Sequence, residues 1–237
     1  MVVKWLGKKQ LLLKALSKPY RIPNYLWWRL GLQGSFNKNV RKRVPFSYEG
    51  VVSGWGIDNA GLPHFSSRLY REVKLLQQAL IGYTANRSLE IGCGYGRLTP
   101  WIMDYSKEHF AVEPEEKLLN DAKVLNPKVQ FYHARAQKLP FPDEYFDLVV
   151  TWTVIQHMPP QEQVKAIREI NRVAKKSAVL LITEGTGTLE NEVVWFHTIE
   201  DWIELFKPWK LVWKTKRILE ETAAKDQGTV MRFEKKN

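Results

Sequence analysis

Cysteine is nearly absent from this 237-residue chain, in which Cys93 is the only one. A single thiol excludes a disulfide within the chain and is typical of proteins that work in a reducing compartment. Long hydrophobic runs are absent too. The longest stretch without Asp, Glu, Lys or Arg, residues 148–161, has 14 residues and is too short to span a bilayer. No segment resembles a targeting signal, so we expect a cytoplasmic protein.

Acidic residues are scarce in the first 50 positions, which hold eleven Lys or Arg but only Glu49. The remaining chain holds 25 basic and 24 acidic residues, so the net charge of +11 lies almost entirely in the first part. Such a separation of charge indicates an anionic partner. We expect a basic, aromatic-rich extension over residues 1–60, followed by a catalytic domain over residues 61–237.

The extension admits three interpretations. Residues 2–16 have the spacing of a short amphipathic helix, and the paired Trp27 and Trp28 come after it. Lysine-rich amphipathic helices with tryptophan dock on anionic membranes, which predicts a peripheral membrane location. Basic and aromatic residues also bind nucleic acid, through phosphates and stacked bases. In the third interpretation the extension is a lid over the active site, and its charges are merely solvated.

Beyond residue 60, hydrophobic periodicity of the strand type alternates with periodicity of the helical type. We expect strands at 87–91, 109–113, 128–132, 146–152 and 177–183, and helices at 66–80, 98–105, 115–125, 160–174 and 198–206. Two late strands, 209–218 and 228–235, are expected to pair as an antiparallel hairpin at the sheet edge. The alternation predicts an α/β fold: a doubly wound, Rossmann-like, mostly parallel sheet with helices on both faces.

Residues 89–97 read Leu-Glu-Ile-Gly-Cys-Gly-Tyr-Gly-Arg, and this glycine loop is the most informative motif of the chain. A buried strand that runs into such a loop lets a ligand lie directly against the backbone. A helix that begins near Leu98 would aim its amide groups at that ligand. Dinucleotide-binding loops have a third small residue where this chain has Arg97, and no Gly-Lys-Ser/Thr is present. The pattern therefore disfavours nicotinamide and flavin dinucleotides and excludes a phosphate loop.

The glycine loop resembles motif I of the class I S-adenosylmethionine-dependent methyltransferases, and three further segments come after it in that family's order. His-Phe-Ala-Val-Glu-Pro at 109–114 is similar to the family's second strand with its acidic end. Leu-Pro-Phe-Pro-Asp-Glu-Tyr-Phe-Asp-Leu-Val-Val at 139–150 is similar to the run into the fourth strand, and Ile-Gln-His-Met at 155–158 to the segment after it. The resemblance covers residues 80–235 and is greatest with the small-molecule branch that includes quinone methyltransferases.

The resemblance implies S-adenosylmethionine as the cofactor and S-adenosylhomocysteine as its product. It places the methionine part against the glycine loop, the ribose hydroxyls at Glu113, and the adenine at Ala136 and Gln137. The implied cofactor-binding residues are Glu90, Gly92, Gly94, Gly96, Glu113, Pro114, Ala136, Gln137 and Thr151. One position departs from the family's pattern. Arg135 stands where an aspartate often holds the adenine amino group, and a guanidinium has no acceptor.

Methyl transfer from a sulfonium needs no acid, because the leaving group is neutral, and the enzyme mainly holds donor and acceptor in line. A base helps only when the acceptor must lose a proton. His157 is the predicted base, since it lies just after the fourth strand on the acceptor side and histidine titrates near neutral pH. His197 and Glu184 are weaker candidates. Cys93 is either a nucleophile or a small side chain packed under the cofactor.

Several reaction classes are disfavoured by the residues just after the fourth strand. Thr-Trp-Thr-Val at 151–154 lacks the Asn/Asp-Pro-Pro-aromatic signature of exocyclic-amine methylation, and no cysteine there serves carbon-5 methylation. No cluster has metal-ligand spacing, so we expect no metal. We expect methyl transfer, at oxygen, to a small-molecule or lipid-like acceptor. The alternative is a non-catalytic scaffold of the same fold that binds RNA or an anionic membrane through its basic first residues.

Overall fold

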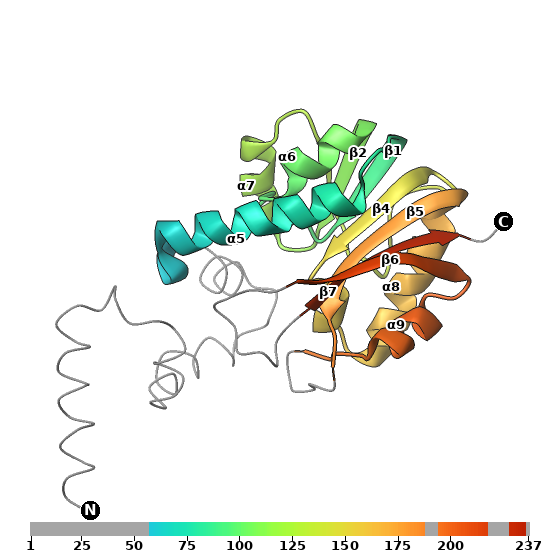
Figure 1. The fold of residues 1–237 in the computed structure, drawn as a ribbon. Coiled ribbons are helices and arrows are strands. Elements are labelled where there is room, and N and C mark those ends of the chain that lie inside the picture. Colours follow the sequence, from blue (N-terminus) through green and yellow to red (C-terminus); the bar gives the residue numbers. More distant parts are fainter. Residues whose placement is uncertain (1–56, 188–193, 218–227, 236–237) are drawn as a thin grey trace, which may run out of the picture.

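The computed structural model describes residues 57–187, 194–217 and 228–235 (Figure 1). The amphipathic helix predicted at 2–16 and the other basic positions up to residue 50 lie outside these ranges. Within the described ranges, no helix is long and apolar enough to cross a membrane. The first described helix, α5 (Ile57–Ala79), begins before residue 60, and the division of the chain at that position stays a prediction.

A seven-stranded sheet forms the centre of the fold, in the order β3-β2-β1-β4-β5-β7-β6. Its strands are β1 (Ala85–Ile91), β2 (Ser106–Glu113), β3 (Gln130–His133), β4 (Phe146–Trp152), β5 (Ala174–Gly185), β6 (Trp209–Arg217) and β7 (Gly228–Lys235). The first five strands are parallel, whereas β7 pairs antiparallel with both β5 and β6. The predicted doubly wound sheet with its antiparallel hairpin at the edge is therefore confirmed.

Helices cover both faces of the sheet (Figure 1). Besides α5 they are α6 (Thr99–Ile102), η2 (Met103–Tyr105), α7 (Glu116–Leu125), η3 (Ile155–His157), α8 (Pro160–Val173) and α9 (Ile199–Leu205). Because successive strand residues point to opposite faces, Val149 of β4 packs in the core with α8 and α9, and Val150 packs in the core with α5. Val73 and Leu76 of α5, and Leu80 just after it, are buried on this face.

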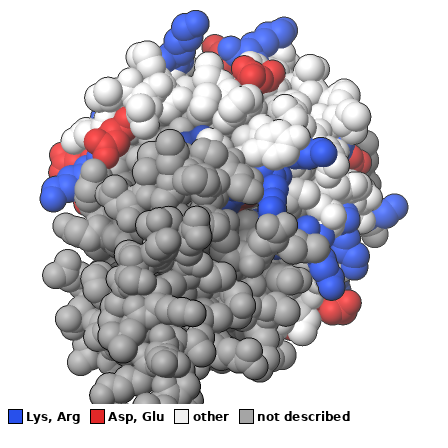
Figure 2. Space-filling view, turned by 60° about the vertical axis from the view of Figure 1, so that its left-hand side comes forward, with Lys and Arg blue, Asp and Glu red and all other residues white. Residues whose placement is uncertain are grey.

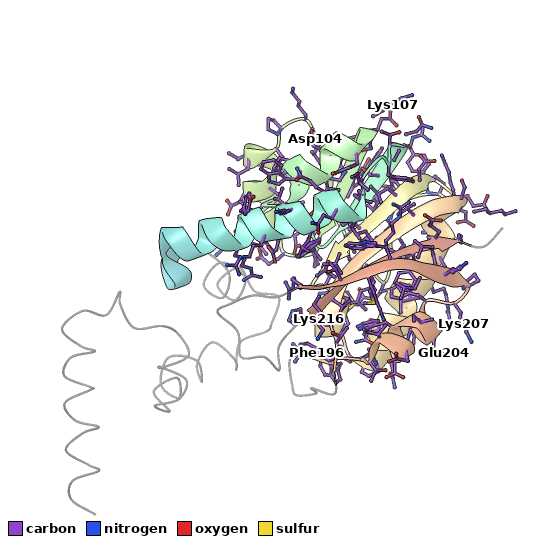
Figure 3. All side chains as sticks on the ribbon, in the orientation of Figure 1. Asp104, Lys107, Phe196, Glu204, Lys207 and Lys216 are labelled. Carbon is purple, nitrogen blue, oxygen red and sulfur yellow. The ribbon has the colours of Figure 1, made fainter. Side chains whose placement is uncertain are left out.

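The five parallel strands end along one edge of the sheet, here called the carboxyl edge. Strand β6 runs in the same direction as β5, because both pair antiparallel with β7, so β6 ends at this edge too. Figure 3 shows Lys216 and Phe196 at the carboxyl edge and Lys107, near the start of β2, at the opposite edge. Ligands of open α/β sheets bind beyond the carboxyl ends of the strands, so this edge is where a site is expected.

Candidate active site

The glycine loop joins β1 to α6 in a backbone conformation that side chains rarely adopt. Gly92, Gly94 and Gly96 have φ angles of +71°, +57° and +81°, all in the left-handed region that favours glycine. The Gly92 amide donates to the Val112 carbonyl at 2.8 Å, which carries the pairing of β1 with β2 into the loop. The backbone therefore turns sharply at the carboxyl edge, as the motif predicts.

Glu113 ends β2 and faces the glycine loop. Its Oε2 accepts a hydrogen bond from the Gly94 amide at 2.9 Å, and its Oε1 accepts one from the Glu115 amide at 3.0 Å. Burial raises the pKa of this carboxyl to about 7, against the lowering effect of the two amide bonds. Carboxylate oxygens carry more than one lone pair, so each can also accept a bond from a ligand hydroxyl.

A cavity of about 380 Å³ lies between the glycine loop, the turn after β2, residues 134–137 and the segment after β4. Eight of the ten predicted site residues line it: Glu90, Gly92, Gly94, Glu113, Pro114, Ala136, Gln137 and His157. These residues come from four separate stretches of sequence. The structure brings them together because the ends of β1, β2, β3 and β4 are neighbours along the carboxyl edge.

Gly96 and Thr151 are the two predicted cofactor contacts that the structure does not place in the cavity lining. A Cβ at Gly96 would lie 2.5 Å from the side-chain nitrogen of Asn126, which donates to the Gly96 carbonyl. Packing inside the protein thus accounts for this glycine. Thr151 is fully buried, and its hydroxyl donates to Glu184 at 3.1 Å. Both residues support the walls of the site, and their direct contact with the cofactor stays a prediction.

Gly92 lines the cavity, but a neighbouring side chain also requires it to be glycine. A Cβ at this position would lie 2.6 Å from a methyl group of Val154, in the segment after β4. This close approach joins the glycine loop to the opposite wall of the cavity. Sequence reasoning attributed the glycine to a ligand, because the contact with Val154 depends on the pairing of β1 with β4.

Glu90 faces the cavity and also braces the loop beneath it. Its Oε2 accepts a hydrogen bond from the Thr99 hydroxyl at 2.6 Å, which holds the start of α6. The Nε2 atom of His109 lies 3.6 Å from the same carboxyl oxygen. The buried Glu90 side chain therefore has a structural partner and a surface toward the cavity.

Residues 134–137 border the cavity at the place implied for the adenine. Arg135 stands exposed at this border and supplies no side-chain acceptor. The side-chain nitrogen of Gln137 donates to the sulfur of Met158 at 3.4 Å, which orients the amide beside the cavity. Of these two neighbouring side chains, only Gln137 has a group that can accept a hydrogen bond from an amine.

The two histidine candidates occupy different places. His157 lies in η3, directly after β4, and lines the cavity, with its Nε2 3.2 Å from the side-chain nitrogen of Gln156. His197 lies outside the cavity lining. Its Nε2 pairs with Gln163 Oε1 at 2.7 Å, and its ring packs edge-on against Trp202. By position, His157 is the better candidate for a base.

The Cys93 thiol lines the cavity but is buried, and burial raises its pKa well above the usual range. A thiol that stays protonated is a poor nucleophile, so the geometry supports the packing role rather than the nucleophilic one. Within the described part of the chain, no group of three or more His, Cys, Asp or Glu side chains is placed to hold a metal ion.

Glu184, a weaker base candidate, is instead a clamp on the segment after β4. Its buried carboxylate accepts hydrogen bonds from the amides of Val154, Ile155 and Gln156 at 3.0–3.3 Å, besides the Thr151 hydroxyl. Burial raises the pKa of this carboxyl to about 7. Glu184 lies outside the cavity lining, so it acts on the site through the segment that carries His157.

We expect Glu184→Ala to lower the free energy of unfolding by about 3 kcal/mol, because three amides and a hydroxyl lose their acceptor in a buried place. Hydrogen exchange would locate the effect: the amides of Val154, Ile155 and Gln156 should exchange faster. Thr151→Val is the control, since it removes only one of the four donors and should cost about 1 kcal/mol. Unchanged exchange at the three amides would contradict the clamp.

A buried charge cluster beside the cavity, here called the arginine cluster, matches no sequence motif. The Glu72 carboxylate on α5 accepts hydrogen bonds from Arg97, from Arg68, from Arg217 at 3.2 Å and from the Trp152 indole at 3.1 Å. Burial acts to raise the pKa of Glu72, but the three guanidiniums outweigh it and hold the pKa at about 2. The spacing of Arg68 and Glu72 is visible in the sequence, but such pairs are ordinary on solvated helix faces.

Comparison with known proteins supports the family resemblance. Residues 89–182 match a family model described as a methyltransferase domain. A probable S-adenosylmethionine-dependent methyltransferase of Mycobacterium tuberculosis is 32% identical over 100 residues, which cover 42% of this chain and 36% of that protein. An uncharacterized methyltransferase of Staphylococcus carnosus is 31% identical over 141 residues, which cover 56% of this chain and 66% of that protein. The chain thus spans only part of the length of these relatives.

Among solved structures, a methyltransferase of Burkholderia thailandensis has a similar fold, with a TM-score of 0.60 and 16% identity over 80% of this chain and 87% of that one. It is named as a 1,6-didemethyltoxoflavin-N1-methyltransferase, and its structure contains 1,6-didemethyltoxoflavin and S-adenosylhomocysteine. At this identity the similarity shows the fold alone.

Proposed function

Because this chain belongs to the class I S-adenosylmethionine-dependent methyltransferase superfamily, we propose that it moves the methyl group of S-adenosylmethionine to an oxygen of a small-molecule or lipid-like acceptor. One observation carries the proposal: the buried Glu113 carboxylate, held by the amides of Gly94 and Glu115 at the wall of the cavity. A carboxylate in this place can accept hydrogen bonds from both hydroxyls of a ribose, so it suits a nucleoside ligand.

The residues around the cavity fit the other groups of this cofactor. Glu90 and Arg68 line the cavity beside the glycine loop, where a carboxylate suits an ammonium and a guanidinium suits a carboxylate. Gln137, beyond Glu113, offers an amide for the edge of the adenine. The volume of about 380 Å³ lies within the usual range of ligand pockets.

When bound, S-adenosylmethionine supplies an electrophilic methyl group on a positively charged sulfur. The chain itself holds the reactants close together and in line, which is the main requirement of this displacement. Val154 packs against Gly92. Through this contact the glycine loop and the segment after β4 form one continuous wall of the cavity. His157 lines the cavity on that wall, and its proposed role is to take the proton of an acceptor hydroxyl.

The acceptor is proposed from two observations of different kinds. The B. thailandensis neighbour is named for methylation of a small molecule and contains that molecule, so this fold can serve a small acceptor, and we propose one here. The choice of oxygen rests on residues 151–154, which lack the signature of exocyclic-amine methylation. Both parts of the proposal concern the described domain, and the segment that matches the M. tuberculosis relative covers 36% of that protein.

Calorimetric titration of the purified protein with S-adenosylmethionine and S-adenosylhomocysteine tests the proposal. We expect both to bind with micromolar dissociation constants, which would also show that Arg135 is compatible with adenine. If a folded protein without retained cofactor binds neither, the methyltransferase proposal fails. The non-catalytic scaffold would then be the better description.

We expect His157→Ala to slow turnover by about a hundredfold, since a positioned general base contributes at least that much. The dissociation constant of S-adenosylhomocysteine should stay within about twofold, because no cofactor group is proposed to contact this ring. The measurement is a pH–rate profile with an acceptor found by screening phenols, hydroxy acids and quinols. Loss of the acidic limb of the profile in the variant would support the base. A normal rate would remove His157 from the mechanism.

For location, we propose the cytoplasm, with the basic first 50 residues attached to an anionic membrane surface. The motivation is the separation of charge, since that stretch contains eleven Lys or Arg and a single acidic residue. The full chain should co-sediment with vesicles that contain phosphatidylserine and not with neutral phosphatidylcholine vesicles, and salt should weaken the binding. Equal recovery with both kinds of vesicle would reject this location, and RNA would become the partner to test.

A further inference from the structure

The arginine cluster contains more positive charge than its carboxylate can offset. Glu72 is fully buried, and it is shared between Arg97 and Arg217 even when Arg68 is left aside. The side chains of Arg97 and Arg217 are only 16% and 5% exposed. Burying cations is costly unless each has a partner, so two guanidiniums on one carboxylate leave a demand for a further anion.

Hydrogen bonding shows the same deficit. The Nε atom of Arg217 is buried and has no hydrogen-bond partner among the described residues. Glu90 and Glu184 also act electrostatically on the cluster, on Arg97 and Arg217 respectively. Each already has its own donors, since Glu90 is bonded to Thr99 and Glu184 to the segment after β4. Neither carboxylate therefore takes the place of an anion bonded directly to Arg97 or Arg217.

The position of Arg97 opens the cluster to a ligand. Arg97 ends the glycine loop and lines the cavity, whereas Arg217, the last residue of β6, is not in the cavity lining and shares Glu72 with Arg97. Arg68 of α5 and Arg97 both line the cavity, so the cluster borders it where α5 meets the end of the glycine loop. Lysine and arginine side chains also gather on part of the outer surface (Figure 2), but solvent and salt screen such exposed charges.

The cofactor cannot supply the missing charge. S-adenosylmethionine carries a sulfonium, an ammonium and one carboxylate, so its net charge is positive, and its binding adds to the positive charge of this region. Arg68 lines the same side of the cavity and suits the cofactor's carboxylate. With the cofactor's one carboxylate assigned to Arg68, an anion for Arg97 would come with the second reactant.

We propose that Arg97 binds an anionic group of the methyl acceptor, a carboxylate or a phosphate, and that Arg217 positions Arg97 through their shared partner Glu72. This inference rests on the proposed function and narrows its acceptor to anionic molecules. The anion is the recognition group, and the reacting atom is still an oxygen of the acceptor. A guanidinium is well suited to this task because its parallel N–H groups match the oxygens of carboxylates and phosphates.

Inorganic phosphate is the probe, titrated at constant ionic strength into three forms of the full-length protein. The forms are the protein alone, the protein saturated with S-adenosylhomocysteine, and the protein saturated with 5′-methylthioadenosine, which lacks the amino-acid part. We expect phosphate to bind all three with similar millimolar affinity. If S-adenosylhomocysteine blocks phosphate and 5′-methylthioadenosine does not, the anion site belongs to the cofactor's carboxylate and the proposal is overturned. No phosphate binding to any form also overturns it.

Variants show whether Arg97 is the group that binds. Arg97→Gln should weaken phosphate binding about tenfold, and Arg97→Lys, which keeps the charge, should weaken it less. Arg87→Gln removes an arginine at the opposite edge of the sheet, where it pairs with Glu108, and should change nothing. If Arg97→Gln does not fold, Arg97→Lys decides: unchanged phosphate affinity would count against Arg97. Binding of S-adenosylhomocysteine to the wild type, measured in parallel, separates failure of this inference from failure of the proposed function.

Discussion

Glu113→Ala should raise the dissociation constant of S-adenosylhomocysteine about a hundredfold, the largest effect on binding that we expect from one side chain. Two hydrogen bonds from ribose hydroxyls to a carboxylate contribute about 1.5 kcal/mol each, or about 3 kcal/mol together. The variant also takes away the acceptor of the Gly94 and Glu115 amides, which loosens the glycine loop. Calorimetric titration measures the change directly.

Glu116→Gln is the matched control, because Glu116 is the exposed acid three positions further on and does not line the cavity. The dissociation constant of S-adenosylhomocysteine for Glu116→Gln should stay within about twofold of the wild-type value. If Glu113→Ala is folded and binds as tightly as this control, Glu113 does not hold the ribose. The assignment of the whole cavity to a nucleoside would then need another basis.

The pKa of Glu113, about 7, makes the same site sensitive to pH. The ionised carboxyl accepts hydroxyl hydrogen bonds better than the neutral one, so binding should release a proton near neutral pH. The dissociation constant of S-adenosylhomocysteine should therefore rise as the pH falls from 8 to 6. Glu113→Gln should bind more weakly and lose this dependence. A dependence that remains in this variant would belong to another group, with Glu184 the first to test.

Glu72→Gln should have the largest effect on stability, a loss of about 3–5 kcal/mol in the free energy of unfolding. The change keeps the size of the side chain but leaves the guanidiniums of Arg68, Arg97 and Arg217 buried without a negative partner. Glu108→Gln is the control, because it also breaks an arginine pair, with Arg87, but at a half-exposed site. Exposed pairs contribute about 0–1 kcal/mol. Urea unfolding of the two variants compares them, and equal losses would contradict the buried cluster.

The stability of the protein at low pH should also depend on the Glu72 carboxylate. The pKa of Glu72 is about 2 in the folded chain, below its ordinary value of 4.5. A lowered pKa contributes stability that is complete above the unfolded value and is lost as the pH falls toward the folded one. The wild type should therefore lose stability between about pH 4.5 and 2 more steeply than Glu72→Gln. Parallel curves would show that Glu72 does not cause the loss.

The amino-acid sequence by itself determined the fold class and predicted most of the residues that line the candidate cavity. Hydrophobic periodicity is a local property, so the alternation of strands and helices could be read without knowledge of their packing. The glycines at 92 and 94 and the acid at 113 were readable for the same reason. Their spacing along the chain already places a strand end, a sharp turn and a second strand end in order.

Only the tertiary structure decided which residues support the site and which face it. Gly96 and Thr151 could not be separated from the cavity lining by sequence, because Asn126 and Glu184 reach them from distant elements. Glu184 likewise changed from a candidate base to a clamp once β4 and β5 were paired.

The arginine cluster is the clearest example of a feature that could not be predicted from the sequence. Its members come from α5, the glycine loop, β4 and β6, and apart from the ordinary i,i+4 spacing of Arg68 and Glu72 these charged positions carry no local signal of pairing. The energy of a charged group depends on the solvent and the charges around it, and these are fixed by the packing of segments far apart in the chain. The sequence therefore predicted the residues that we propose to bind a nucleoside, while the fold alone decided where positive charge is concentrated beside them.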